Sequence, residues 1–319
     1  MRVAGTKMHK PIVVVGSVNL DLVCTAERIP VPGETLTGAN FQTFYGGKGA
    51  NQAVAVGRLG YPVSMVAKVG DDEFGPRLRN GLRAAGVNVR AVGTAKGTAS
   101  GVALISVDRK GQNSIIVVPG ANGRLLPRDL EKALPVLRSA GMILAQLEVP
   151  METVEYLCGA AQRLKVPLML DPAPARPIPL RMLRQVTYLT PNESETCTLC
   201  DAGGRDLNLS TAAEFAQILR SQGAANVIIK MGGSGAYVSG ANGFARRVPA
   251  FKVKAVDSTA AGDAFNGGLA VALMRGKTLE EAVRFGAAVA AISVTRRGAQ
   301  PAMPTAREVS SFLKRQRRA

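Results

Sequence analysis

Short apolar runs and helical patterns alternate along most of this 319-residue chain. Continuous apolar runs, typical of strands covered on both faces, occur at residues 12–15, 64–69, 142–146, 167–170, 186–189 and 227–230. Segments with apolar residues at helical spacing lie between several of them, at residues 49–59, 75–85, 151–164 and 211–222. This alternation predicts an α/β fold with a mostly parallel central sheet between two layers of helices, that is, an α/β/α sandwich.

Two stretches, at about residues 18–45 and 98–118, break the alternation. Neither has long helical periodicity. The second contains strand-like segments at 101–107 and 113–118, with Gly111 between them at a hairpin turn. An insertion of this kind is a common way to build a lid over a ligand. We therefore expect a small antiparallel β-sheet lid on a single domain that spans residues 1–319.

The composition changes this picture little. Hydrophobic residues make up 46% of the chain and charged residues 20%, which is usual for globular proteins and excludes disordered, collagen-like and disulfide-scaffold classes. Glycine is frequent, with 35 residues, and tryptophan is absent. These features favour an α/β protein with tight turns around a ligand over a protein that stacks nucleic-acid bases.

The formal net charge is +17, from 40 Lys and Arg against 23 Asp and Glu. Such a charge first suggests nucleic acid or a membrane surface. The basic residues are scattered, however, apart from a run at 314–319 that we interpret as a solvated basic tail. An anionic substrate such as a nucleotide accounts for part of the charge. Nucleic acid is therefore not an expected partner.

The cysteines, the single histidine and the hydropathy exclude several further classes. His9 is the only histidine, so the pair Cys197-x-x-Cys200 lacks partners for a zinc site, and we interpret it as two reduced thiols, like Cys24 and Cys158. No apolar run reaches about 18 residues, and nothing resembles a signal peptide. We expect a cytoplasmic protein without a membrane partner.

The segment Asp257-Ser-Thr-Ala-Ala-Gly-Asp263 carries the clearest chemistry. It follows an apolar stretch and precedes an Ala- and Leu-rich helix. Small residues at a helix start leave backbone N–H groups open to an anion, which predicts an anion hole at 260–262. A carboxylate beside a phosphate site is repelled unless it has a task there, so Asp263 is our candidate for the base that takes a proton from a hydroxyl attacking phosphorus. The alternative is that Asp263 only caps the helix.

A second segment is Gly46-Gly-Lys-Gly-Ala-Asn-Gln52, ahead of a predicted helix. It is not a Walker A loop, because no Ser or Thr follows Lys48. Adjacent glycines allow close backbone approach to a ligand, Lys48 supplies a cation and Asn51 supplies an amide. A plain tight turn is the alternative.

Polar side chains also stand where predicted strands end, the edge at which parallel sheets bind ligands. Asn19 and Asp21 follow the first strand, and Glu148 follows the run at 142–146; such groups suit a polyol. Asn192 and Glu195 follow the run at 186–189 and could orient Mg²⁺-bound waters, or simply begin a helix. Lys230 ends a strand before three glycines, which predicts either a nucleotide contact or a hairpin turn.

Together these segments resemble the ribokinase-like family of carbohydrate kinases, in order and spacing, from about residue 11 to about residue 313. Further similarity lies in Gly111-Gln-Asn-Ser114, Pro119-Gly-Ala-Asn122 and Val294-Thr-Arg-Arg-Gly-Ala-Gln-Pro301. The resemblance implies an α/β/α sandwich with a β-lid, homodimerisation through the lid, and transfer of the γ-phosphoryl group of ATP to the 5-hydroxyl of D-ribose. It also implies Mg²⁺ with ATP and activation by K⁺.

The resemblance assigns roles to individual residues. Asp263 matches the catalytic base and also contacts the sugar. The other sugar contacts implied are Asn19, Asp21, Gly47, Lys48, Gly49, Asn51 and Glu148. The ATP contacts implied are Asn192, Lys230, Gly232, Gly233, Ser234, Gly235, Ala261 and Gly262, with Glu195 acting indirectly on Mg²⁺. The monovalent cation site implied is Asp257, Thr259, Ser293, Arg296 and Gly298.

Three positions depart from the family pattern. Ala260 stands where many members have glycine, and its methyl should not block a backbone amide. Ala287 stands where His or Asn often contacts the adenine. Ala302 replaces a common serine at the cation site, so one ligand has no counterpart. None of the three touches the phosphoryl-transfer residues.

Two other functions compete with this interpretation. The first is a kinase of the same family for 2-deoxyribose, fructose, a nucleoside or pseudouridine. The second is a non-catalytic sugar or nucleotide sensor that binds nucleic acid through its basic tail. The presence of Asp263 argues against the sensor.

Overall fold

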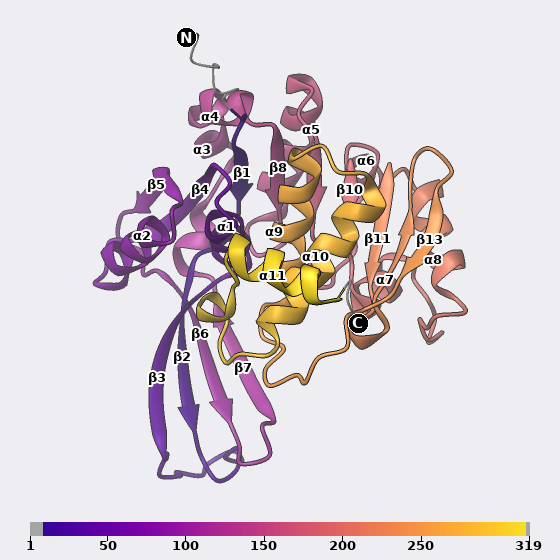
Figure 1. Cartoon of the computed structure of the whole chain (residues 1–319). Coiled ribbons are helices and arrows are strands. Elements are labelled where there is room, and N and C mark those ends of the chain that lie inside the picture. Colours follow the sequence, from indigo (N-terminus) through magenta and orange to yellow (C-terminus); the bar gives the residue numbers. More distant parts are fainter. Residues whose placement is uncertain (1–8, 317–319) are drawn as a thin grey trace, which may run out of the picture.

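In the computed structural model, which describes residues 9–316, a nine-stranded sheet runs through the middle of the molecule (Figure 1). Its order is β13-β12-β11-β10-β9-β8-β1-β4-β5. The strands from β11 to β5 pair in parallel, and β12 and β13 add an antiparallel hairpin at one edge. The strands are β1 (Ile12–Val15), β4 (Val63–Gly70), β5 (Asn88–Ala95), β8 (Met142–Ala145), β9 (Leu168–Leu170), β10 (Tyr188–Leu189), β11 (Asn226–Lys230), β12 (Ala236–Ser239) and β13 (Ala245–Val248).

Helices cover both faces of this sheet because alternate residues of a buried strand point to opposite sides. In β1, Ile12 and Val14 belong to one hydrophobic core, while Val13 and Val15 belong to the other. The first core is shared with α1 (Lys48–Arg58), α2 (Phe74–Ala84), α9 (Ala261–Met274), α10 (Leu279–Ser293) and α11 (Ala306–Gln316). The second is shared with α3 (Pro127–Lys132), α4 (Leu134–Ser139), α5 (Met151–Leu164), α6 (Leu180–Leu183), α7 (Glu193–Leu199) and α8 (Ala212–Ser221). The three-layer sandwich is thus confirmed.

A separate four-stranded sheet extends from one end of the sandwich, at the bottom of Figure 1. It consists of β2 (Asn19–Thr25), β3 (Asn40–Gly46), β6 (Gly101–Val107) and β7 (Asn113–Val118), in the order β3-β2-β6-β7. The two outer pairs are antiparallel, as predicted, but the central pair β2–β6 is parallel. The reason is that β2 follows β1 and β6 follows β5, so both leave the carboxyl edge of the main sheet in the same direction.

The predicted strands and helices are found close to their expected bounds, and the predicted lid occupies 19–46 and 101–118. Gly111 lies in the left-handed region with φ +80°, as a hairpin turn requires. Strand β5, the β12–β13 hairpin and helices α10 and α11 were not predicted. Residues 314–316 end helix α11 instead of forming a tail, and 317–319 lie outside the described residues. That the chain forms a single domain over 1–319 stays a prediction.

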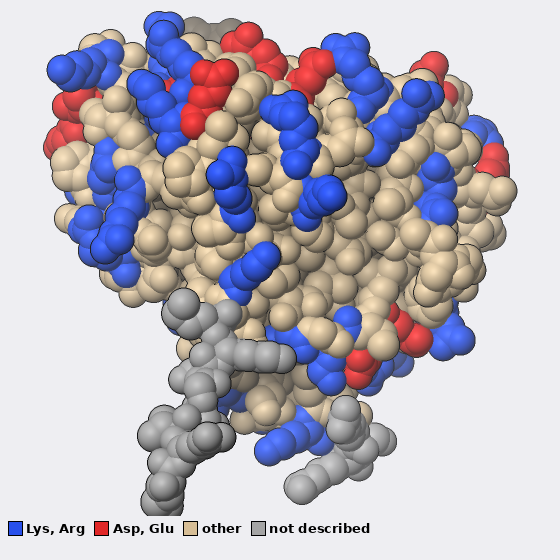
Figure 2. Space-filling model, turned by 90° about the horizontal axis from the view of Figure 1, so that it is seen from above, with Lys and Arg blue, Asp and Glu red and all other residues tan. Residues whose placement is uncertain are grey.

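Lys and Arg side chains are spread over the face seen in Figure 2, separated by uncharged surface and by a few acidic residues. They do not gather into one stripe on that face, in keeping with the scattered charge of the sequence. Of the helices within residues 9–316, none is long and apolar enough to cross a membrane.

Candidate functional site

Helix α9 begins at a turn that exposes its first backbone amides. Ala260 precedes the helix with φ +57°, in the left-handed region that a Cβ disfavours, so its methyl strains the turn even though it leaves the amides open. The amide of Ala261 donates to the carbonyl of Ser258 at 3.1 Å. The backbone amides of Gly262 and Asp263 are also in the first turn of α9, where no preceding carbonyl of the helix accepts a hydrogen bond from them. This start of α9 corresponds to the predicted anion hole.

Asp263 lies in the first turn of α9 and is only 4% exposed. Its Oδ2 accepts a hydrogen bond from Asn51 Nδ2 at 3.0 Å, and its Oδ1 accepts one from Gln52 Nε2 at 3.1 Å. It forms no cap, since no side chain accepts from an amide at this helix start. The capping alternative is therefore wrong, and the carboxylate is a buried acceptor between α9 and α1.

The surroundings of Asp263 place its pKa near neutrality. Burial raises the pKa of Asp263 to about 6, and the carboxyl group of Asp171 also raises it. The ammonium of Lys48 and the two amide hydrogen bonds lower it, so they limit the rise. A carboxylate with this pKa is ionised at pH 7 and accepts a proton more readily than an ordinary aspartate.

The glycine loop before α1 fixes Lys48 and Glu148 relative to each other. Gly47 has φ +87°, and a Cβ there would lie 2.8 Å from the amide nitrogen of Asn19, so only glycine fits. The amide of Lys48 donates to Glu148 Oε2 at 3.0 Å. Burial acts to lower the pKa of the Lys48 ammonium, but the carboxylates around it, Asp263 foremost, outweigh this and raise it. Lys48 is therefore firmly cationic.

A cavity of about 610 Å³ lies between the lid and the carboxyl ends of the main strands. Its polar lining includes nearly all the predicted sugar contacts: Asn19, Asp21, Gly47, Lys48, Asn51, Glu148 and Asp263. The apolar side chains Ala103, Ile105, Ile115 and Val117 line it from β6 and β7. A ligand here would meet hydroxyl-binding groups on one side and apolar lid residues on the other.

A second cavity, of about 480 Å³, lies on the other side of the start of α9. Its walls are mostly apolar, with Phe251, Val253 and Ala287 among them. Gly232, Gly233 and Gly235 also line this cavity. The residues common to both cavities are Lys230, Gly232, Ser258, Ala261 and Gly262. The two cavities therefore meet at the predicted anion hole.

Asn192 and Glu195 form a capping box at the start of α7. The Asn192 side chain accepts from the Glu195 amide, and the Glu195 carboxylate accepts from the Asn192 amide at 2.8 Å. These two residues therefore begin a helix, as the alternative interpretation of this segment expected. Both residues nevertheless line the larger cavity. Burial raises the pKa of Glu195, while the Lys230 ammonium acts against this.

Three of the predicted monovalent-cation residues, Asp257, Thr259 and Gly298, are joined by hydrogen bonds between the loop before α9 and the loop after α10. Asp257 Oδ1 accepts from the amide and the hydroxyl of Thr259, at 2.9 and 2.6 Å, and its Oδ2 accepts from the amide of Gly298 at 2.8 Å. Burial acts to raise the pKa of Asp257, but these hydrogen bonds outweigh it and keep the pKa low. Arg296 pairs with Glu308, and Ser293 is buried. Ala302 is buried without a hydroxyl, as the sequence requires.

The sequence matches the pfkB family of carbohydrate kinases over residues 9–306. The chain belongs to this family. It is 42% identical to a ribokinase of Bacillus subtilis over 95% of this chain and 99% of that protein, and 39% identical to a ribokinase of Haemophilus influenzae over 96% and 99%. It is also similar to the structure of Arabidopsis thaliana ribokinase complexed with ribose and ATP, with a TM-score of 0.90, 34% identity and coverage of 96% and 99%.

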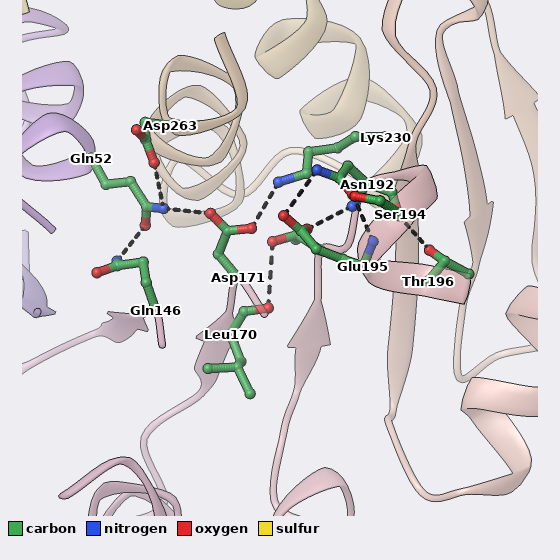
Figure 3. Close-up of polar contacts among 11 residues, drawn as sticks. Gln52, Gln146, Leu170, Asp171, Asn192, Ser194, Glu195, Thr196, Lys230 and Asp263 are labelled. Carbon is green, nitrogen blue, oxygen red and sulfur yellow. Dashed lines mark hydrogen bonds and ion pairs between the residues drawn. The ribbon is translucent and has the colours of Figure 1, made fainter. Parts of the chain in front are cut away.

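One charged residue of this carbohydrate kinase was missed in the sequence. Asp171 directly follows β9 and is 2% exposed; its Oδ1 pairs with Lys230 Nζ at 2.8 Å (Figure 3). Gln52, also not predicted, donates to both Asp171 and Asp263. The signal for Asp171 was present, because it follows a buried strand as Glu148 does.

Some predicted residues lie apart from the cavities. Gly49 lines neither; a Cβ on it would lie 2.7 Å from the backbone of Gly16, so it permits close packing of α1 on the loop after β1. Ser234 lines neither, and its carbonyl accepts from Arg247. Cys197 lies on α7 and Cys200 caps its end; both are free thiols, and residues 9–316 hold no group of His, Cys, Asp and Glu arranged for a metal ion.

Replacement of Asp21 by Asn tests the charge balance of the larger cavity. Burial raises the pKa of Asp21 to about 6, and the carboxylate of Glu148 raises it further in the same direction. A raised acid pKa means that the folded state binds the proton more tightly. The ionised Asp21 carboxylate therefore destabilises the folded state. This destabilisation is absent below the pKa of the unfolded state, near 4, and is complete well above the folded-state pKa of about 6. We expect Asp21→Asn to raise the free energy of unfolding at pH 7 by about 1–2 kcal/mol, discounted because Asp21 is partly solvated.

Urea unfolding at pH 7 and pH 4 measures this effect. The gain should vanish at pH 4, where the wild-type carboxyl group is largely protonated. Asp206→Asn, at an exposed position, is the control and should change stability at neither pH. An equal effect of Asp21→Asn at both pH values would contradict the electrostatic explanation.

Proposed function

We propose that this kinase transfers the γ-phosphoryl group of ATP to the 5-hydroxyl of D-ribose, giving D-ribose 5-phosphate and ADP. The observation that carries the proposal is the junction of the two cavities at the start of α9, with the buried carboxylate of Asp263 beside it. A polar cavity suits a sugar, and a mostly apolar cavity with glycines in its lining suits a nucleotide. The relatives named above as ribokinases support ribose as the sugar.

Asp263 acts as the base. The sugar hydroxyl oxygen forms a bond to the γ-phosphorus while the bond from that phosphorus to the ADP oxygen breaks, and the hydroxyl proton passes to Asp263. The pKa of about 6 leaves Asp263 ionised at pH 7 and makes the transfer less uphill than for an ordinary aspartate. In a loose transition state the proton moves late, so even a weak base suffices. The amides at the start of α9 and the ammonium of Lys230 receive the phosphate charge.

Sugar binding falls to the polar groups of the larger cavity. Asn19 and Asp21 from β2, Lys48 and Asn51 from α1, and Glu148 after β8 surround the space next to Asp263. Several are already oriented: Asn122 Nδ2 donates to Asn19 Oδ1 at 2.7 Å, and Ser17 Oγ donates to Glu148 Oε2 at 2.5 Å. Such groups bind a polyol without rearranging, which favours positioning of one hydroxyl at the base.

Two cations fit the donors that are present. Glu195 carries a carboxylate toward the cavity junction, and with Asn192 it would hold Mg²⁺ through its waters, where the cation would neutralise the phosphates of ATP. The Asp257 carboxylate, kept anionic by its hydrogen bonds, would hold K⁺ together with loop carbonyls near residues 293–298, where the cation adds positive charge behind the anion hole. Gly49 and Ser234 keep their assigned contacts only as predictions.

The lid supports a homodimer. Its β7 strand is exposed along its whole length, and the outer side chains Leu104, Ile116 and Val118 are 44%, 63% and 44% exposed. Leu104 and Ile116 stand opposite each other in the β6–β7 pair, so they form one apolar surface. A second lid of the same chain, packed on this surface, would bury it and protect the free edge of β7.

A substrate panel tests the proposed reaction. ADP release from Mg-ATP is measured with D-ribose, 2-deoxyribose, fructose, nucleosides and pseudouridine, each in K⁺ or Na⁺. We expect kcat/KM for D-ribose to exceed every other acceptor by about tenfold or more, with K⁺ raising the rate. Faster turnover of another sugar would move the specificity and keep the chemistry. Folded protein that binds ATP but phosphorylates nothing would refute the enzyme proposal and favour the sensor.

Replacement of Asp263 by Asn tests the base. The amide keeps the size of the side chain and cannot take a proton, so kcat should fall by about 10²–10⁴-fold, while ATP and ribose still bind, as measured by calorimetry. Asp206→Asn is the control at an exposed site and should keep the wild-type rate. Retention of more than about a tenth of wild-type kcat would show that Asp263 is not the base.

Replacement of Ile116 by Glu tests the dimer. A charge on the outer lid surface would have to be buried in the interface, so the variant should sediment as a monomer at micromolar concentration while the parent sediments as a dimer. Leu180→Glu changes an equally apolar residue that is 49% exposed on α6, away from the lid, and should not alter the association state. A dimeric Ile116→Glu variant would rule out this surface.

A further inference from the structure

The side-chain amide of Gln52 lies between two buried carboxylates. Its Nε2 donates to Asp263 Oδ1 at 3.1 Å and to Asp171 Oδ2 at 2.9 Å (Figure 3). Gln52 is 1% exposed, Asp171 2% and Asp263 4%. Water therefore screens the repulsion between these two negative charges only weakly. The two N–H groups of the Gln52 amide lie between the carboxylates, and each carboxylate accepts a hydrogen bond from one of them.

The orientation of the Gln52 amide is fixed by a hydrogen bond to its oxygen from Gln146. Gln52 Oε1 accepts a hydrogen bond from Gln146 Nε2 at 2.7 Å. If the Gln52 amide were turned over, its oxygen would face two carboxylates and its nitrogen would face the donor of Gln146. The cost of the observed arrangement is that Gln146 Oε1 has no hydrogen-bond partner within residues 9–316. Leaving this buried acceptor unpaired is unfavourable, and in return the Gln52 amide is held in a single orientation.

The chain of contacts continues to the anion hole. Asp171 Oδ1 pairs with Lys230 Nζ, and Lys230 also lies against the start of α9, where a Cβ on Gly262 would be 3.3 Å from its Nζ. Lys230, Asp171, Gln52 and Asp263 thus form one series from the nucleotide side of the junction to the sugar side (Figure 3).

We propose that Gln52 is a positioning residue that keeps Asp263 ionised and aimed at the sugar hydroxyl, by donating one N–H to Asp263 and the other to Asp171. This inference rests on the proposed function, in which Asp263 is the base. Gln52 lies outside the cavity lining and acts through Asp263. Its role is to let a second carboxylate stand next to the base, where it holds Lys230, without forcing the base to bind a proton.

The other groups around Asp263 do not replace this donor. Asn51 donates to the opposite oxygen, Oδ2, and is itself held by Gln300 Nε2 at 3.2 Å. The charged neighbours are Lys48, which favours the ionised form, and Asp171, which disfavours it. Without Gln52 the repulsion from Asp171 would act on an oxygen with no donor, and Asp263 would be protonated at a higher pH.

The test is the pH dependence of ribose phosphorylation by Gln52→Leu, which keeps the volume and removes both N–H groups. We expect the acid limb of kcat/KM to move up by about one pH unit or more, so that the rate at pH 6 falls about fivefold or more below the parent. Above about pH 9, where Asp263 is ionised in both proteins, the rates should agree within about threefold. Titration of ¹³C-labelled aspartate carboxyl groups by NMR, with Asp263→Asn for assignment, should show the same shift without substrate.

Two further variants separate positioning from packing. Asn266→Leu removes a fully buried amide from α9 that has no hydrogen-bond partner within the described chain, so it perturbs the same helix without removing a hydrogen bond to either carboxylate. It should leave the acid limb in place. Gln146→Leu keeps the donors of Gln52 and removes only their alignment, so it should give a smaller shift in the same direction, and it serves if Gln52→Leu does not fold.

Each outcome decides the proposal. An equal loss of rate at all pH values, or an unchanged acid limb in both Gln52→Leu and Gln146→Leu, would overturn it, because a merely structural role does not depend on the protonation of Asp263. A shift as large in Asn266→Leu would overturn it as well. Failure of the proposed function is distinct: the unaltered enzyme would then phosphorylate no sugar, and the NMR titration would still report whether Gln52 holds the pKa of Asp263 down.

Discussion

A carboxylate that is almost wholly removed from water stays ionised only if donors and positive charge surround it, and this requirement governs the centre of the molecule. Asp263 meets it with two amides from one turn of α1 and with the ammonium of Lys48. The packing of α1 against α9 therefore does more than bury apolar side chains, because it also supplies the hydrogen-bond donors of Asp263. It brings the glycine loop before α1 next to the start of α9, that is, the proposed sugar-binding residues next to the proposed anion hole.

The same constraint explains why the two cavities differ in character. The larger one is lined by several charged side chains, and some of these form ion pairs, such as Lys230 with Asp171. The smaller one is lined mostly by apolar residues, and its charged side chains are the two lysines Lys230 and Lys252. Parallel strands make this possible, since residues after β1, β8, β9 and β10 all arrive at one edge of the sheet although they are far apart in the sequence. The lid then covers that edge with Ile105 and Ile115.

Much of this organisation could be predicted from the sequence, and particular residues show why. Glu148, Asn192 and Asp263 each follow a strand or begin a helix, so local pattern alone places them at the ligand edge. Asp171 had the same signal but no neighbouring motif, and Gln52 ends the glycine-rich segment 46–52 without a charge or other feature that would have assigned it a role. Their importance comes from contacts with residues more than a hundred positions away. Strand β5 and the β12–β13 hairpin were missed because their exposed faces dilute the apolar pattern.

The left-handed backbone of Ala260 carries a consequence of its own. A glycine at φ +57° would be unstrained but would let the turn before α9 sample a wide range of shapes. Alanine adds about 1 kcal/mol of strain and, in exchange, narrows the conformations open to the chain both before and after folding. The turn before α9 is thus stiffer than it would be with glycine at position 260. In the proposed reaction, part of the ordering of this turn would then be complete on folding, and less would be left for the binding of ATP.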